Sequence, residues 1–244
     1  ATLILRFLFR RESDPNRRTA VLAVAVMGLL FKWGAISYPL MVTSDEDFHA
    51  NRLSEVLAGN LHTTSVSQHD PPFRIPYPVS LYVAAAPLVK AGMERVGAIQ
   101  MVTATADVLV GVVLVLFAGR FLNDRRAGIL AAVVYQFVPL NFLTFSAGNF
   151  TNLFGVATTV FFLAYLIAGA EGGSHRVAIG AFVFSTVAQT SHFSTFLVGV
   201  LLWPLGWMAI FGLPPLPLRP RHTRLLAMAV GVSLVLVLVY YAGY

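Results

Sequence analysis

Apolar runs of about 20 residues recur along this chain, and they constrain its fold more than any other feature. The interior of a bilayer has no water to satisfy backbone polar groups, so only helices or a closed barrel can cross it. The runs are uniformly apolar rather than alternating, which favours helices. Charged residues make up only 11% of the chain, against about 25% in a typical soluble domain. We therefore predict an all-α fold, a polytopic membrane helical bundle.

The apolar runs predict about seven transmembrane helices. They cover residues 19–42, 98–119, 127–145, 153–170, 177–190, 193–211 and 225–244. Residues 1–18 are predicted to be a cytoplasmic or interfacial segment, and residues 19–244 to form the transmembrane module. Residue 1 is Ala, and the last apolar run has no polar tail after it. We therefore expect the module to be a fragment of a longer protein.

Basic residues in the turns indicate how the loop before residue 98 is placed. The segment 77–95 is apolar for only about 13 residues, which is short for a span. If it crossed the membrane, the later basic turns would lie opposite the basic N-terminal segment. If it lies along the surface, all basic clusters face the cytoplasm, as the positive-inside rule requires. We therefore predict that residues 43–97 form one outer loop with two juxtamembrane helices.

The remaining composition limits the partners of the chain. Its net charge of +6 comes from Lys and Arg in short turns that set topology, and it does not indicate a nucleic-acid partner. The chain has no cysteine, which excludes a disulfide or a thiolate metal site. The expected partners are membrane lipid and other membrane subunits.

The segment Thr43–Pro78 is the one long polar stretch, and any chemistry is expected there. Five of the 11 acidic residues and three of the six histidines fall in it. They are Asp45, Glu46, Asp47, Glu55 and Asp70, with His49, His62 and His69.

The first half of this segment is predicted to be a helix with Ser44 as its N-cap. At helical spacing, Asp45, His49 and Arg52 fall within an arc of roughly 60°. An acid, an imidazole and a guanidinium on one face could take a proton from an acceptor hydroxyl and hold a phosphate. The alternative is a charged helix face that is merely solvated.

The second half cannot be helical, because Pro71 and Pro72 force extended geometry on the residues before them. One interpretation is a stiff linker back to the bundle. The other places His69, Asp70 and Arg74 over the first helix. Oxygen and nitrogen ligands from this loop could also hold a divalent cation, although nothing in their spacing demands a metal. Those ligands would be Asp45, Asp47, His49 and Asp70.

Polar residues inside or between the apolar runs give weaker candidates. Asp107 lies within a span, where an ionisable residue is a functional hypothesis unless Lys32 or Lys90 pairs with it. His192 lies in a helix break, where it could line a cavity or be an interfacial histidine. The topology brings this break, the turn Ser146–Asn152 and the outer loop to the same face of the membrane.

The motifs of the loop resemble those of the GT-C glycosyltransferases. The loop begins S-D-E-x-x-H-x-x-R at Ser44, continues with G-N at Gly59, and reaches P-P-x-x-x-x-Y-P at Pro71. The segment from Ala98 through the arginine turn, and the later P-L-N-F-L-T-F-S stretch, also resemble that class. The class includes protein O-mannosyltransferases, oligosaccharyltransferase catalytic subunits and lipid A aminoarabinose transferases, and the resemblance covers about residues 19–212.

The resemblance implies a catalytic role for Asp45, with Glu46, as the base or acceptor-orienting pair. It implies a polyprenyl-phosphate-linked sugar as donor and an active face on the non-cytoplasmic side of the plasma (inner) membrane. The candidate donor-phosphate groups are His49, Arg52, His69, Asp70, Arg74 and His192. Many members of the class have Lys where this chain has Ser191-His192. A non-catalytic GT-C-like subunit of a larger complex remains the alternative, and a transporter of lipid-linked sugar ranks last because intramembrane charges are few.

Overall fold

The structure is a computed structural model, and it describes residues 15–38, 44–66, 70–121, 124–172, 174–201 and 220–244. These residues are mostly helical, as the apolar runs predict. Five of the described helices are long and apolar enough to cross a membrane. Their apolar stretches are Thr19–Ile36, Arg95–Ala118, Arg126–Ser146, Phe150–Gly169 and Arg224–Ala242.

The count of seven spans is not confirmed. The predicted span 177–190 corresponds to α9 (His175–Gln189), whose 15 residues are fewer than the roughly 20 that a crossing helix needs. The predicted span 193–211 is helical over 193–201 and then leaves the described residues. The N-terminal segment 1–14 and His69 also lie outside the described residues.

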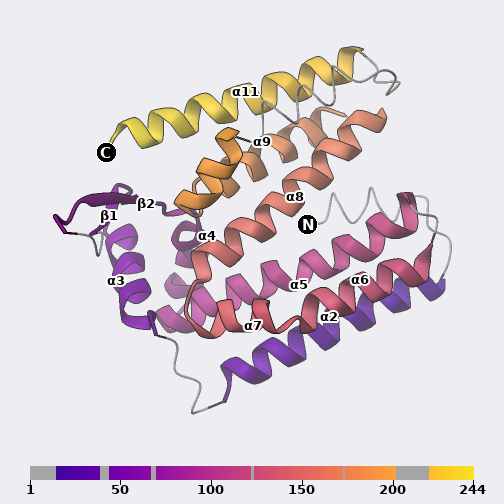
Figure 1. Ribbon diagram of the computed structural model, residues 1–244, viewed down its shortest axis with the longest axis horizontal. Helices are drawn as coiled ribbons and strands as arrows, with labels where there is room; N and C mark the ends of the chain where they lie inside the picture. The colour runs from indigo at the N-terminus through magenta and orange to yellow at the C-terminus, as the bar shows by residue number, and fades with distance from the viewer. Residues whose placement is uncertain (1–14, 39–43, 67–69, 122–123, 173, 202–219) are drawn as a thin grey trace.

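The long helices form two neighbouring groups (Figure 1). The helices α2 (Pro15–Ile36), α5 (Arg95–Phe121) and α6 (Arg125–Phe137) pack side by side. On the other side, α8 (Phe150–Gly172) packs against both α5 and α9, and α11 (Pro220–Ala242) lies along α9. The core between them is built mainly from Ala, Val, Leu and Phe.

The predicted span 127–145 is split in two. The helix α6 ends at Phe137, and α7 (Pro139–Ser146) follows. The residue between them, Val138, has φ −59° and ψ 123°, which is the extended geometry that a following proline imposes. The two pieces still provide one apolar stretch of 21 residues.

The predicted outer loop holds two short helices, α3 (Glu46–Leu57) and α4 (Ser80–Lys90). Between them lies a β-hairpin that the sequence did not predict. Its strands β1 (Thr63–Val66) and β2 (Arg74–Tyr77) pair antiparallel, with Thr63 opposite Tyr77 and Val66 opposite Arg74. The helices and the hairpin gather at one end of the bundle, where α11 also ends (Figure 1).

Asp107 is buried among three helices and is paired. It forms an ion pair with Lys32 of α2 and accepts a hydrogen bond of 2.6 Å from the Tyr135 hydroxyl of α6. Both charged side chains are almost fully buried. Of the two lysines that could satisfy Asp107, the structure therefore identifies Lys32.

Candidate functional site

The start of α3 rests against the turn that joins α7 to α8. The Ser44 hydroxyl donates to the Ala147 carbonyl at 2.6 Å, and His49 Nε2 lies 2.6 Å from the Gly148 carbonyl oxygen. Gly148 has φ +77°, and a Cβ there would lie 3.1 Å from the Asp45 Cβ. This turn therefore fixes the position of Asp45, and it needs glycine both for its backbone conformation and for its space.

The prediction of Ser44 as N-cap is wrong by one residue. The N-cap is Asp45, and its side chain makes no capping hydrogen bond. The Ser44 hydroxyl points instead to Ala147, which is 103 residues further along the chain. A sequence pattern shows which residues can cap a helix. It does not show that a backbone carbonyl from a distant turn binds the same side chain instead.

His49 is the most enclosed of the candidate residues. Its Nε2 must donate to the Gly148 carbonyl, because a carbonyl can only accept. Its Nδ1, which lies 2.7 Å from the Tyr82 hydroxyl, is then the acceptor in the neutral ring. Burial lowers the pKa of His49, and this outweighs the Gly148 bond and the Asp45 carboxylate, which both raise it. His49 is therefore held as a neutral imidazole with a fixed tautomer.

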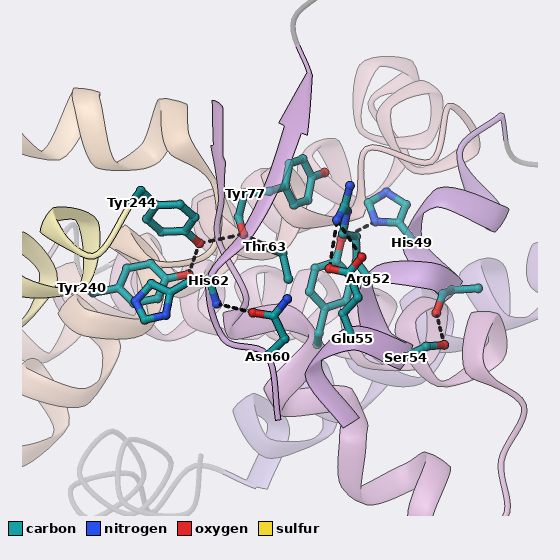
Figure 2. Close-up of polar contacts among 12 residues, drawn as sticks. His49, Arg52, Ser54, Glu55, Asn60, His62, Thr63, Tyr77, Tyr240 and Tyr244 are labelled. Carbon is teal, nitrogen blue, oxygen red and sulfur yellow. Dashed lines mark hydrogen bonds and ion pairs between the residues drawn. The ribbon is translucent and has the colours of Figure 1, made fainter. Parts of the chain in front are cut away.

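Arg52 is engaged within its own helix. One guanidinium nitrogen lies 2.9 Å from each carboxylate oxygen of Glu55, and the guanidinium carbon lies 4.9 Å from the centre of the Phe48 ring. Figure 2 shows Arg52 and Glu55 joined beside His49. Glu55 engages only one of the guanidinium nitrogens, so a phosphate bound to Arg52 would share the guanidinium with that carboxylate.

The three polar features expected on one face do meet. The turn 146–149 contacts α3, as described above. The helix break contacts α4, because Ser80 donates its backbone N–H to the Thr190 carbonyl at 3.0 Å and its hydroxyl lies 2.5 Å from that of Thr190. His192 follows in this break and accepts from the Ser194 backbone N–H at 3.2 Å. Burial lowers the pKa of His192.

The structure does not bring all predicted residues together. Asp45, Asp47, Asp70 and Arg74 are exposed. No hydrogen bond or ion pair within the described residues joins Asp70 or Arg74 to Asp45 or His49. Glu46 turns toward α5, where its carboxylate lies 3.5 Å from Gln100 Nε2. Within the described parts of the chain, no three His, Asp or Glu side chains lie close enough to hold a metal ion, so the proposed metal ligands are not assembled there.

Sequence reasoning missed the contacts between the hairpin and α11 (Figure 2). The Tyr240 hydroxyl donates to the Leu61 carbonyl at 3.1 Å. The Tyr244 hydroxyl donates to the Tyr77 carbonyl at 3.4 Å, as Figure 2 shows. The His62 ring stacks on Tyr240 with centroids 5.4 Å apart. The only signal in the sequence was the group of tyrosines at the end of the last apolar run, which is also typical of a membrane interface.

The site as a whole places the exposed carboxylate of Asp45 beside a neutral imidazole that is already bonded at both nitrogens. Such an arrangement can accept a proton at Asp45, whereas His49 positions the surrounding backbone. No protein-family model matches this chain, and no curated protein matches it either.

Proposed function

We propose that this chain is a membrane-embedded glycosyltransferase module of the GT-C type. It would move a sugar from a polyprenyl-phosphate donor to an acceptor on the non-cytoplasmic face of the plasma membrane. The observation that carries the proposal is the placement of Asp45, an exposed carboxylate whose backbone is fixed by the turn 146–149. The motif resemblance implies that the same carboxylate is the catalytic base.

In the proposed reaction, Asp45 accepts the proton of the acceptor hydroxyl. The acceptor oxygen bonds to the anomeric carbon, and the bond from that carbon to the phosphate oxygen breaks. The bonding electrons leave with the polyprenyl phosphate, whose charge needs a cation nearby. Arg74 is exposed and free of Glu55, so it is the first candidate. His192 is the second, and because burial lowers its pKa it would act as a neutral hydrogen-bond donor rather than as a cation. The charge of Arg52 is already partly neutralised by Glu55, so it is the third candidate.

Asp45→Asn tests the proposal, with Asp47→Asn as its matched control. Both acids are exposed and near the start of α3, so either change removes the same charge from the same helix end. Loss of a general base typically costs about 10²- to 10⁴-fold in rate. We expect Asp45→Asn to lose transfer of sugar from a polyprenyl-phosphate donor in membranes, and Asp47→Asn to retain it. Full activity of Asp45→Asn would overturn the role of Asp45.

A second candidate function, a non-catalytic GT-C-like subunit of a larger membrane complex, is favoured by a different observation. Two of the candidate side chains are already engaged. Arg52 forms an ion pair with Glu55, and the His49 ring is buried. Large apolar side chains, such as Leu30 and Leu130, are exposed and need lipid or another subunit around them. This candidate predicts no transfer by the wild-type chain and no difference between the Asp45 and Asp47 variants.

A further inference from the structure

One face of α5 is polar although it lies inside the apolar core. Gln100, Thr103 and Asp107 fall within an arc of about 60° and extend over about 10 Å of helix. Gln100 is 7% exposed, and Thr103 and Asp107 are fully buried. We call these three residues the polar row of α5.

The polar row connects two charged groups. At one end, Gln100 Nε2 lies 3.5 Å from a carboxylate oxygen of Glu46, at the start of α3. At the other end, Asp107 pairs with Lys32 and accepts from Tyr135. The row therefore extends from the loop end of the bundle to an ion pair buried between α2, α5 and α6 (Figure 1).

The middle of the row holds a hydroxyl that has no hydrogen-bond partner among the described residues. Threonines in helices usually donate to the carbonyl four residues earlier, as Thr159, Thr186 and Thr190 do here. Thr103 is fully buried, yet its Oγ1 makes no such bond within the described part of the chain. The Gln136 side-chain oxygen, which belongs to an amide bonded to the Asp107 and Val108 carbonyls, is likewise buried and unpaired there.

Leaving a buried polar atom unsatisfied destabilises the folded state. In native proteins such atoms are usually bonded to buried water, which needs several polar partners at one place. Neighbouring members of the polar row supply them, because the Thr103 hydroxyl lies about one helical turn from both the Gln100 amide and the Asp107 carboxylate. Water at the row would also solvate the Lys32–Asp107 pair, whose burial is costly without it.

We propose that the polar row of α5 is a water-binding site that makes the buried Lys32–Asp107 pair accessible to solvent from the side of α3. The ligand is water, entering past Gln100 and Glu46. The Lys32–Asp107 pair is then a hydrated site within the bundle rather than a dry structural bridge. This inference does not depend on the proposed transferase activity, because it rests on α5 and its neighbours alone.

Cysteine labelling tests this inference directly, because the chain has no cysteine of its own. A small charged methanethiosulfonate reacts only with a thiolate, which forms where water reaches the sulfur. The test variants are Gln100→Cys and Thr103→Cys. The controls are Val108→Cys and Val112→Cys, whose positions are buried and lie at least about 100° round the helix from the centre of the row. All four are labelled in the folded, detergent-solubilised protein and again after unfolding.

We expect Gln100→Cys to react fastest and Thr103→Cys to react about tenfold or more faster than either control, which forms little thiolate in apolar surroundings. All four should react alike after unfolding, which shows that each cysteine is present and reactive. The inference is overturned if Thr103→Cys is as unreactive as the controls in the folded protein. It is also overturned if all four react equally fast there. Thr103→Ser lacks the same methyl group as Thr103→Cys. A thermal melt of Thr103→Ser like that of the wild type would show that losing this methyl group does not open the structure.

Discussion

His49 is the residue of the site whose protonation is most controlled by its surroundings. Burial holds its pKa below the ordinary value of 6.5, and its two ring nitrogens already bond Tyr82 and Gly148 in the neutral form. Well above pH 6.5 the ring is neutral in both the folded and the unfolded chain. As the pH falls below 6.5, the unfolded chain binds a proton first, so the free energy of unfolding decreases.

His49→Gln should therefore flatten the dependence of stability on pH. A glutamine amide can still donate to the Gly148 carbonyl, but it does not titrate. We expect the melting temperature of the wild type to drop more steeply than that of the variant between about pH 7 and pH 5. Some slope should remain in the variant, because burial lowers the pKa of His192 in the same sense. His62→Gln, at an exposed ring, is the control, and parallel slopes for wild type and His49→Gln would contradict the prediction.

At the residue scale, the sequence identified the correct helix but not the roles of its side chains. Helical spacing placed Asp45, His49 and Arg52 on one arc, and the structure has His49 and Arg52 on α3 with Asp45 as its N-cap. The spacing could not show that His49 is enclosed by Tyr82 and Gly148, because these partners lie 33 and 99 residues away. Long-range contacts of this kind determine which of three neighbouring polar side chains remains exposed.

At the scale of elements, the Gln136 side chain of α6 lies in a slot between α2 and α5, where two glycines leave room for it. Its amide donates to the Asp107 and Val108 carbonyls of α5. Gly111 of α5 and Gly28 of α2 border the slot. A Cβ at Gly111 would lie 2.6 Å from Gln136 Nε2, which is too close for any real contact.

Gly111→Ala should therefore destabilise the bundle, by about 1–3 kcal/mol for an overpacked core. Gly231→Ala on α11 is the matched control, since a Cβ there would meet nothing within 4 Å. Alanine is the better helix former, so this control should be neutral or stabilising by up to about 1 kcal/mol. Unfolding of the purified proteins in detergent measures both changes. Equal effects of the two substitutions would contradict the role of the slot.

Elements that long apolar runs define were predicted well, and short ones were not. The predicted spans 98–119 and 153–170 fall within α5 and α8, because hydropathy over about 20 residues is a strong signal. The hairpin was missed, since each strand has only four residues and β2 contains a proline. Such short strands carry no clear alternation, and their pairing depends on contacts with the rest of the chain.

At the scale of the whole molecule, the last helix fastens the loop that carries the candidate site. Tyr240 of α11 donates to the Leu61 carbonyl, and Tyr244, two residues after the end of α11, donates to the Tyr77 carbonyl of β2. Their hydroxyls also lie 2.8 Å from each other. The C-terminal end of the described chain thereby holds a segment that lies more than 160 residues earlier in the sequence.

The double variant Tyr240→Phe, Tyr244→Phe should loosen the hairpin without disturbing the bundle. It keeps both rings against His62 but removes the hydroxyls that reach Leu61 and Tyr77. Each lost hydrogen bond is worth about 1 kcal/mol, so we expect amide exchange in β1 to quicken by about tenfold or more. Tyr241→Phe is the control, because its hydroxyl donates to Gln189 rather than to the hairpin. Hydrogen exchange followed by mass spectrometry measures both variants. Unchanged exchange in the double variant, or equal quickening in Tyr241→Phe, would show that these hydroxyls do not hold the loop.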